Sequence, residues 1–193
     1  MAIHKIATKW LGKAQDPTRL WGGLLLERPG YKRNSVWPII YDEFFLTFKE
    51  KWPNIKINIC GSIRREIDII HDFDVVIGSK NPEIIEWCCK RIYAELILPE
   101  FRTEIKGFLR GIPIQIWFCN PDEYGPHLLL KTGPQTFNRK LASIAKRLGL
   151  TLSEHGLFKG SPDNRQQRID ENTEANIIWI ILGCKWIHPK DRY

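Results

Sequence analysis

Two short alternating runs, each ended by a glycine, constrain most strongly what this chain can fold into. Residues 55–60 alternate with period two and stop at Gly61, and residues 72–77 form a second such run that stops at Gly78. Period-two alternation followed by a glycine is typical of a strand that leads into a tight turn. The pattern predicts two strands of one sheet, with a tight turn at Gly61.

The flanking segments predict a mixed α+β chain. Apolar residues recur at helical spacing in four segments, which are residues 35–51, 82–94, 137–149 and 173–183. Further strands are expected at residues 103–109 and 112–118, and the polar segment 161–167 is expected to be a loop. Thr173 is the expected N-cap of the last helix.

These elements suggest three parts. Residues 1–54 form an N-terminal extension with the first helix, residues 55–125 a domain with a mixed sheet and flanking helices, and residues 126–193 a small basic unit of helices and a hairpin. No stretch approaches the roughly 20 apolar residues of a membrane span, and the N-terminus has no apolar signal core. We therefore expect an intracellular protein that is not secreted.

Charge and cysteine usage narrow the function classes. The chain of 193 residues has a formal net charge of +7, which favours a polyanionic partner, nucleic acid first. Its five cysteines are odd in number and lie mostly in apolar runs, which favours buried reduced thiols over disulfides or zinc. A secreted disulfide scaffold is therefore excluded.

A candidate metal and nucleotide site lies at the two strand ends. Asp72 and Asp74 are two residues apart, so a strand presents both carboxylates on one side, a donor set that suits Mg²⁺. Gly61 lets the backbone approach closely, Ser62 offers a hydroxyl, and Arg65 can contribute a forked donor to a triphosphate. Two such acids alone are more often a solvated strand end, so the combination carries the prediction.

This combination resembles the signature of the nucleotidyltransferase superfamily, with a spacing similar to that of the family X DNA polymerases, the polymerase beta-like group. Three further segments resemble the family's thumb motifs, and these are residues 131–138 (KTGPQTFN), 150–158 (LTLSEHGLF) and 173–192, from Thr173-Glu174 to Arg192. The similarity covers residues 55–193.

The resemblance implies a palm at residues 55–125 and a thumb at residues 126–193 of a DNA-directed DNA polymerase. Such an enzyme adds dNTPs to a primer 3′-hydroxyl in gapped or repair-type DNA by two-metal phosphoryl transfer, with Mg²⁺ or Mn²⁺. Asp72 and Asp74 would be the catalytic metal ligands. The implied nucleotide-binding residues are Gly61, Ser62, Arg65, His71, Thr132, Gly133 and Asn138.

The N-terminal part departs from the family members of cellular repair. Those carry a lyase domain and a DNA-binding finger domain ahead of the palm, and about 54 residues cannot hold both. The chain resembles the minimal palm-and-thumb polymerases of large DNA viruses, so we expect a monomer without lyase activity, in the cytoplasm, the nucleus or a viral replication site. The basic N-terminal residues either grip DNA or only cover the sheet.

The most consequential departure is at the third carboxylate of the family, which stands in a later strand. The matching segment is residues 112–117, and the matching position is Gln115. A neutral amide brings no charge and is no useful base near pH 7, so the chemical step should suffer. The alternation places Gln115 opposite the core isoleucines, as a site residue should be. An engineered variant and a naturally impaired relative remain alternatives.

Smaller departures concern the nucleotide and the DNA. His71 replaces a glycine and either contacts phosphate or is an exposed loop residue, and Leu130-Lys131 replaces an aromatic pair that helps to exclude ribonucleotides. Ala142 replaces a template-gripping arginine. The basic residues of the thumb helix are expected to meet DNA phosphates, and these are Arg139, Lys140, Lys146 and Arg147.

Two other functions stay open. A non-catalytic relative that still binds DNA and nucleotide is favoured by Gln115. A template-independent nucleotidyltransferase is disfavoured by the thumb motifs. Primer extension on gapped DNA separates all three.

Overall fold

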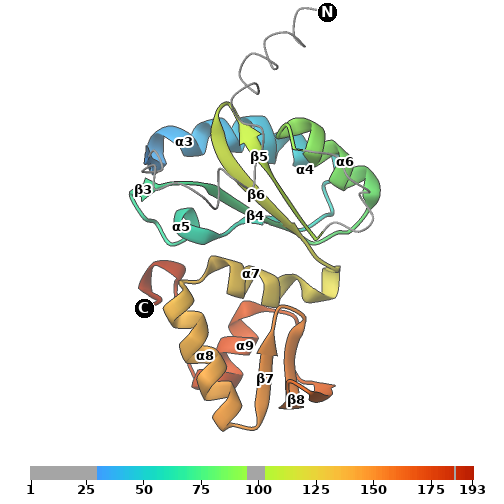
Figure 1. The fold of residues 1–193 in the computed structure, drawn as a ribbon, viewed down its shortest axis with the longest axis vertical. Coiled ribbons are helices and arrows are strands. Elements are labelled where there is room, and N and C mark those ends of the chain that lie inside the picture. The colour runs from blue at the N-terminus through green and yellow to red at the C-terminus, as the bar shows by residue number, and fades with distance from the viewer. Residues whose placement is uncertain (1–29, 95–102, 185) are drawn as a thin grey trace, which may run out of the picture.

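The computed structural model describes residues 30–94, 103–184 and 186–193, and it shows an α+β fold. A four-stranded sheet with helices on both sides forms one part, and helices with a three-stranded sheet form the other (Figure 1). No helix within these ranges is long and apolar enough to cross a membrane. The lysine- and arginine-bearing residues before position 30 lie outside the described residues.

The four-stranded sheet is mixed, as predicted. Its order is β2-β4-β6-β5, where β4 and β6 are parallel and the outer pairs are antiparallel. The strands are β2 (Ile57–Ile59), β4 (Phe73–Ile77), β5 (Glu104–Leu109) and β6 (Ile112–Phe118). A separate two-stranded ladder pairs β1 (Tyr31–Lys32) with β3 (Ile69–Ile70).

Helices cover one face of this sheet (Figure 1). They are α3 (Arg33–Ile40), the π-helical turn η1 (Tyr41–Leu46), α4 (Thr47–Lys51) and α6 (Pro82–Arg91). In β6 alternate residues are fully or almost fully buried among them, because successive side chains of a strand point to opposite faces. The other face of β6 therefore carries its polar residue, Gln115.

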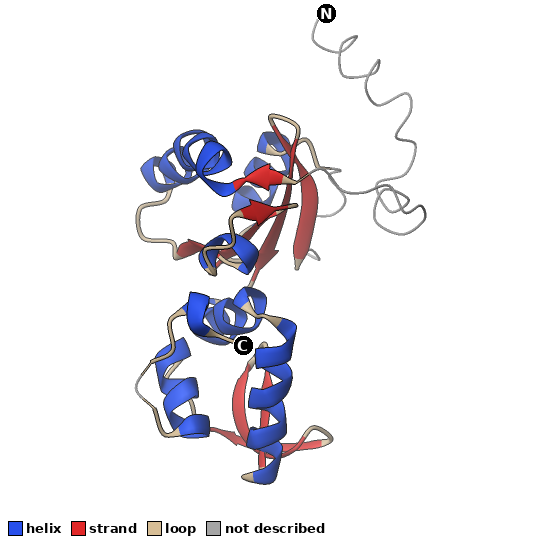
Figure 2. Ribbon diagram, turned by 90° about the vertical axis from the view of Figure 1, so that its left-hand side faces the viewer, coloured by secondary structure: helices blue, strands red, loops and turns tan. Residues whose placement is uncertain are grey.

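The second part packs on the other side of the sheet. It comprises the 3₁₀ turn η3 (Pro121–Glu123), α7 (Tyr124–Thr132), α8 (Gln135–Arg147), β7 (Leu150–Ser153), β8 (Gly156–Ser161), β9 (Asn164–Arg168), α9 (Glu174–Leu182) and the 3₁₀ turn η4 (Pro189–Asp191). Its core joins α7, α8 and α9 through Leu129, Leu141 and Ile177 (Figure 2). Thr173 caps α9, as predicted, since its hydroxyl accepts from the Asn176 amide at 3.1 Å.

Two predictions about local structure were wrong. Residues 161–167 are not a loop, because β9 pairs with β8; the side chains of residues 164–167 are exposed, so no apolar alternation marks the strand. The strand before Gly61 does not lead into a tight turn, because Gly61 begins the short helix α5 (Gly61–Arg64). Helix α7 was not expected, since Gly125-Pro126 at its start is atypical of a helix.

One buried carboxylate fastens the two parts together. Arg64 of α5 donates both terminal nitrogens to Glu174, at 2.7 and 2.5 Å, and Arg192 donates to the same carboxylate at 3.3 Å. The side chains of Glu174 and Arg192 are almost completely buried. A bidentate arginine–carboxylate pair fixes orientation as well as distance, so this contact sets how the second part sits on the sheet.

We predict that Glu174→Gln destabilises the protein by about 3–5 kcal/mol, because it leaves two buried guanidinium groups without a counter-charge. Urea unfolding measures the change. The matched control is Glu86→Gln, which breaks the exposed pair with Lys90 and should cost less than about 1 kcal/mol. Equal losses in the free energy of unfolding for the two variants would show that Glu174 does not hold the two parts together.

Candidate active site

An open cleft of about 440 Å³ lies where α5 and the start of β4 meet the α7–α8 junction. Its lining comes from both parts of the chain and comprises Gly61, Ser62, Arg65, Asp72, Asp74, Leu130, Lys131, Thr132, Gly133, Pro134, Gln135 and Asn138. The motif before β4 and the motif at residues 131–138 are thus brought together.

The two carboxylates lie at the start of β4. Asp72 directly precedes the strand and Asp74 lies within it. Burial, and then the charge of Asp72, raise the pKa of Asp74 to about 7, while Arg65 and Lys131 oppose the rise. A carboxyl with a raised pKa stabilises the fold when protonated, and this contribution is lost as pH rises toward 7. A bound cation would relieve the same repulsion, so the donor set fits a divalent metal.

Gly61 allows α5 to pass directly over Asp74. Its φ is +60°, and a Cβ at this position would overlap the Asp74 carboxylate. The close approach also lets the Cys60 amide donate to the Asp74 carbonyl at 2.9 Å. Only glycine fits here without displacing the carboxylate.

Two buried polar atoms of the cleft have no partner among the described residues. They are the Ser62 hydroxyl and the carbonyl oxygen of the Asn138 side chain, whose amide nitrogen donates to the Leu130 carbonyl at 2.7 Å. Buried polar groups are rarely left unsatisfied. The Ser62 hydroxyl and the cationic Arg65 suit an anionic group of a ligand, whereas the Asn138 oxygen suits a hydrogen-bond donor.

The other predicted nucleotide contacts are placed differently. The buried Thr132 uses its hydroxyl to accept from Arg64 at 2.7 Å, and its carbonyl accepts from Arg65. Gly133 ends α7 with φ +66° beside Arg65. His71 is exposed and lines a neighbouring hollow with Ser62 and Asp72 rather than the main cleft.

The predicted third position lies beside Asp74. Gln115 and Asp74 are direct partners of the parallel strands β6 and β4, which places their side chains on the same face, about 5 Å apart at the backbone. The Gln115 amide donates to Glu104 of β5 at 2.9 Å. The same carboxylate oxygen accepts from the Trp117 indole at 3.1 Å.

Glu104 was not predicted, because it lies 11 residues from Gln115 along the chain. The antiparallel pairing of β5 and β6 aligns Glu104 with Trp117, diagonal to Gln115. The strands expected at residues 103–109 and 112–118 contained this signal, since a two-residue connection makes them antiparallel neighbours.

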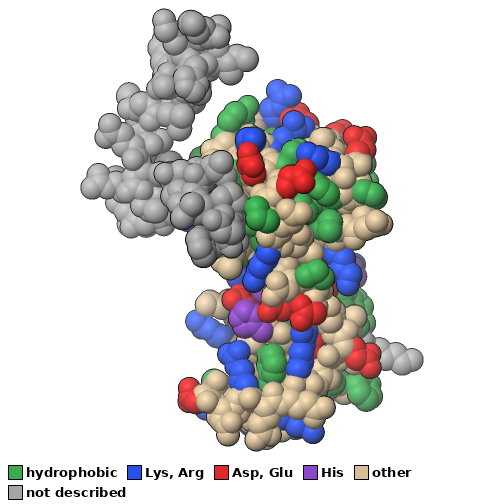
Figure 3. All heavy atoms as spheres, turned by 90° about the vertical axis from the view of Figure 1, so that its right-hand side faces the viewer, with side chains coloured by type: hydrophobic (Ala, Val, Ile, Leu, Met, Phe, Trp, Pro, Cys, Tyr) green, Lys and Arg blue, Asp and Glu red, His purple; other side chains and the backbone are tan. Residues whose placement is uncertain are grey.

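The basic residues of α8 are exposed on the side of that helix away from its core. They are Arg139, Lys140, Lys146 and Arg147, and α8 carries no acid. The Lys140 ammonium also donates to the Tyr193 carbonyl at 3.1 Å. On the right-hand side of the molecule, by contrast, acidic and basic side chains are interspersed (Figure 3). A same-sign stripe of this kind suits a phosphate backbone.

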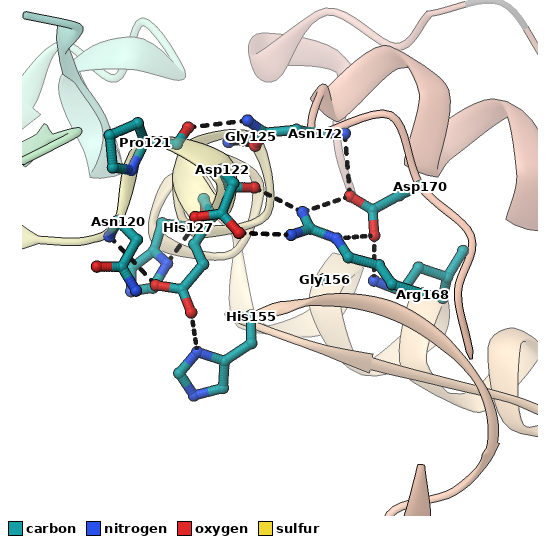
Figure 4. Close-up of polar contacts among 12 residues, drawn as sticks. Asn120, Pro121, Asp122, Gly125, His127, His155, Gly156, Arg168, Asp170 and Asn172 are labelled. Atoms are coloured by element: carbon teal, nitrogen blue, oxygen red, sulfur yellow. Dashed lines mark hydrogen bonds and ion pairs between the residues drawn. The ribbon is translucent and has the colours of Figure 1, made fainter. Parts of the chain in front are cut away.

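A second polar cluster joins η3 and α7 to the hairpin (Figure 4). His155 contacts Glu123 at 2.8 Å, and Arg168 bridges Asp122 and Asp170. These groups already satisfy one another. In the described part of the chain no three His, Cys, Asp or Glu side chains are grouped to hold a metal, so this cluster is structural.

We predict that Gly61→Ala abolishes the thermal stabilisation that Mg²⁺ with dNTP gives, because the new methyl group displaces Asp74. Gly149→Ala is the matched control, since Gly149 also has a positive φ, +72°, but open space around it. Differential scanning fluorimetry with and without Mg²⁺–dNTP measures both. Loss of the ligand response in both variants would mean that backbone strain, not Asp74, is responsible.

Comparison with known proteins agrees with this geometry. Residues 127–193 match the family model described as the DNA polymerase beta thumb. The match begins within α7, which lines the cleft, and ends at the C-terminal residues that pack on Glu174. No curated protein matches the sequence. The C-terminal part of the chain, residues 127–193, is therefore a thumb domain of the DNA polymerase beta type.

Proposed function

We propose that this protein is a DNA-directed DNA polymerase of the family X type, which adds dNTPs to a primer 3′-hydroxyl in short gaps. The observation that supports this most is the cleft that joins Asp72 and Asp74 to the thumb segment 131–138. A thumb of this family implies a DNA partner, and the two carboxylates supply the donor set for its metal.

Asp72 and Asp74 would hold the Mg²⁺ or Mn²⁺ that comes with the nucleotide. When bound, the metals neutralise the developing phosphate charge and activate the primer hydroxyl. Asp74 is held in place by Gly61 and by the opposing charges of Arg65 and Lys131.

The remaining cleft residues would orient the nucleotide. Ser62 and Arg65 line the cleft and would serve as hydroxyl and guanidinium donors to the triphosphate. Gly133 and Asn138 would contact the sugar and base, as the family resemblance implies, and the unpartnered Asn138 carbonyl oxygen is available for that contact. Arg65 is fixed by the Thr132 carbonyl, so it is positioned before the ligand arrives.

Gln115 limits the chemical step. It stands beside Asp74 where the family has its third carboxylate, and its neutral amide can lend one oxygen to a cation but cannot accept the primer proton. Nucleotide binding should therefore be retained while turnover is slow. A non-catalytic DNA-binding relative is the second candidate, and Gln115 is the observation that favours it.

Gln115→Asp tests the polymerase proposal. We expect this variant to extend the primer of a one-nucleotide-gapped duplex by the templated base, at least about tenfold faster than the unaltered chain, with Mg²⁺ or Mn²⁺. Quenched-flow primer extension measures the rate. The control is the double variant that combines Asp74→Asn with Gln115→Asp, and it should extend nothing.

Two other outcomes would replace the proposal. If neither the unaltered chain nor Gln115→Asp extends the primer while both bind gapped DNA, the protein is a binding module. If the nucleotide is added without regard to the template base, it is a template-independent transferase.

The exposed basic residues of α8 should carry the salt dependence of DNA binding. Arg139→Gln with Lys140→Gln should weaken binding and reduce the slope of log affinity against log salt by about two, one for each lost phosphate contact. The charge-matched control is Lys51→Gln with Lys90→Gln, on α4 and α6. Fluorescence anisotropy over a salt series measures both, and equal slopes for the two double variants would rule out α8 as the DNA contact.

A further inference from the structure

We propose that Glu104 is a positioning residue of the candidate active site. Through its hydrogen bond to Gln115 it fixes which end of that amide faces a metal beside Asp74, an inference that rests on the proposed function. Glu104 lies on β5, outside both motifs that form the cleft.

Three side chains contact the carboxylate of Glu104. One of its oxygens accepts from the Gln115 side-chain nitrogen at 2.9 Å and from the Trp117 indole nitrogen at 3.1 Å. Its other oxygen lies 3.5 Å from the Lys106 ammonium. These contacts to three side chains orient the carboxylate, although the Glu104 side chain lies on an edge strand and is 46% exposed.

Trp117 connects this group to the cleft. The ammonium of Lys131, which lines the cleft beside Asp74, lies over the Trp117 ring at 4.9 Å from its centroid. The indole is thus held from one side by a cation and donates from its edge to Glu104. Trp117, which donates to Glu104, is therefore in contact with a residue of the cleft, Lys131.

The chemistry of the amide makes its orientation important. A glutamine side chain has a donor end and an acceptor end, and its terminal torsion has only broad, shallow preferences. An ionised carboxylate accepts hydrogen bonds only, so Glu104 selects the orientation in which the nitrogen faces β5. The carbonyl oxygen is then the end left for a cation. The opposite orientation would present two N–H groups, which repel a cation.

Glu104 does not itself complete a three-carboxylate site. No group of three His, Cys, Asp or Glu side chains with metal-binding geometry exists in the ranges that the structure describes. Glu104 is directed to Gln115 and Trp117 instead. Its influence on the metal therefore passes through Gln115.

This arrangement predicts that the effect of Glu104 depends on residue 115. With Gln115 present, the Glu104 carboxylate aids metal binding by orienting the amide. In Gln115→Asp there is no amide to orient, since an ionised aspartate presents an acceptor oxygen in either orientation. Removing the Glu104 side chain should then change metal binding much less.

The experiment measures Mn²⁺ binding by electron paramagnetic resonance in a complex that cannot react, formed with gapped DNA whose primer ends in a dideoxynucleotide and with the matching dNTP. With Gln115 in place, Glu104→Ala should weaken the second Mn²⁺ site roughly tenfold. Glu104→Gln, whose carbonyl oxygen can still accept from Gln115, should restore part of this loss. In the Gln115→Asp background, Glu104→Ala should weaken Mn²⁺ binding by less than about threefold, because no amide remains to be oriented.

A second readout needs neither metal nor DNA. The ¹⁵N-resolved side-chain amide signals of Gln115 should shift upfield, and exchange faster with solvent, in Glu104→Ala, because the charge-assisted hydrogen bond is lost. Glu86→Ala, on the exposed face of α6, is the control and should change neither these signals nor Mn²⁺ binding.

The outcomes separate this proposal from the polymerase proposal. Unchanged Gln115 signals in Glu104→Ala, or an equal loss of Mn²⁺ affinity in both backgrounds, would overturn the role of Glu104. So would the absence of a second Mn²⁺ site in every variant. A loss specific to the Gln115 background, together with no primer extension by any variant, would uphold Glu104 as a positioning residue and overturn only the polymerase proposal.

Discussion

The buried carboxylate of Glu174 is the contact on which the candidate site depends. Arg64 of α5 and Arg192 near the C-terminus both donate to it, and Arg64 also donates to the Thr132 hydroxyl. The neighbouring Arg65 lines the cleft and binds the Thr132 carbonyl. One ion pair therefore sets the distance between the carboxylates at β4 and the α7–α8 junction, and neither half forms the cleft alone.

A second cluster, near the start of α7, fixes that helix to the segment between β9 and α9 within the second part. Arg168 donates to the Asp122 carbonyl at 2.7 Å, and Asn172 donates to the Pro121 carbonyl and accepts from the Gly125 amide (Figure 4). At Gly125 a Cβ would overlap the Asn172 backbone, so close packing requires a glycine there. With Glu174 near one end of α7 and this cluster at the other, α7 is a fixed floor of the cleft.

The sequence predicted those elements whose burial follows a simple period. Strand β6 alternates because it buries one face, and this alternation placed Gln115 on the opposite face. Strand β4 buries Phe73, Val75 and Ile77 in the main core and carries Asp74 on its other face, where the register makes it a neighbour of Gln115. Structure without an apolar pattern, and contacts between distant residues, could not be predicted. Strand β9 has polar exposed side chains and is held by backbone pairing with β8, so no periodicity marks it. The Arg64–Glu174 pair joins residues 110 positions apart, where no local signal links them.

Gln115 affects the electrostatic repulsion around Asp74 as well as the number of metal ligands. Burial and Asp72 already raise the pKa of Asp74 to about 7, even with Arg65 and Lys131 nearby. A third carboxylate at position 115 would lie next to Asp74 on the adjacent strand and close to Glu104, and would add to this repulsion. The neutral amide therefore favours the metal-free fold, whereas an aspartate would favour the metal-bound one. Residue 115 thus shifts the balance between stability without metal and affinity for a second cation, which is the affinity that phosphoryl transfer requires.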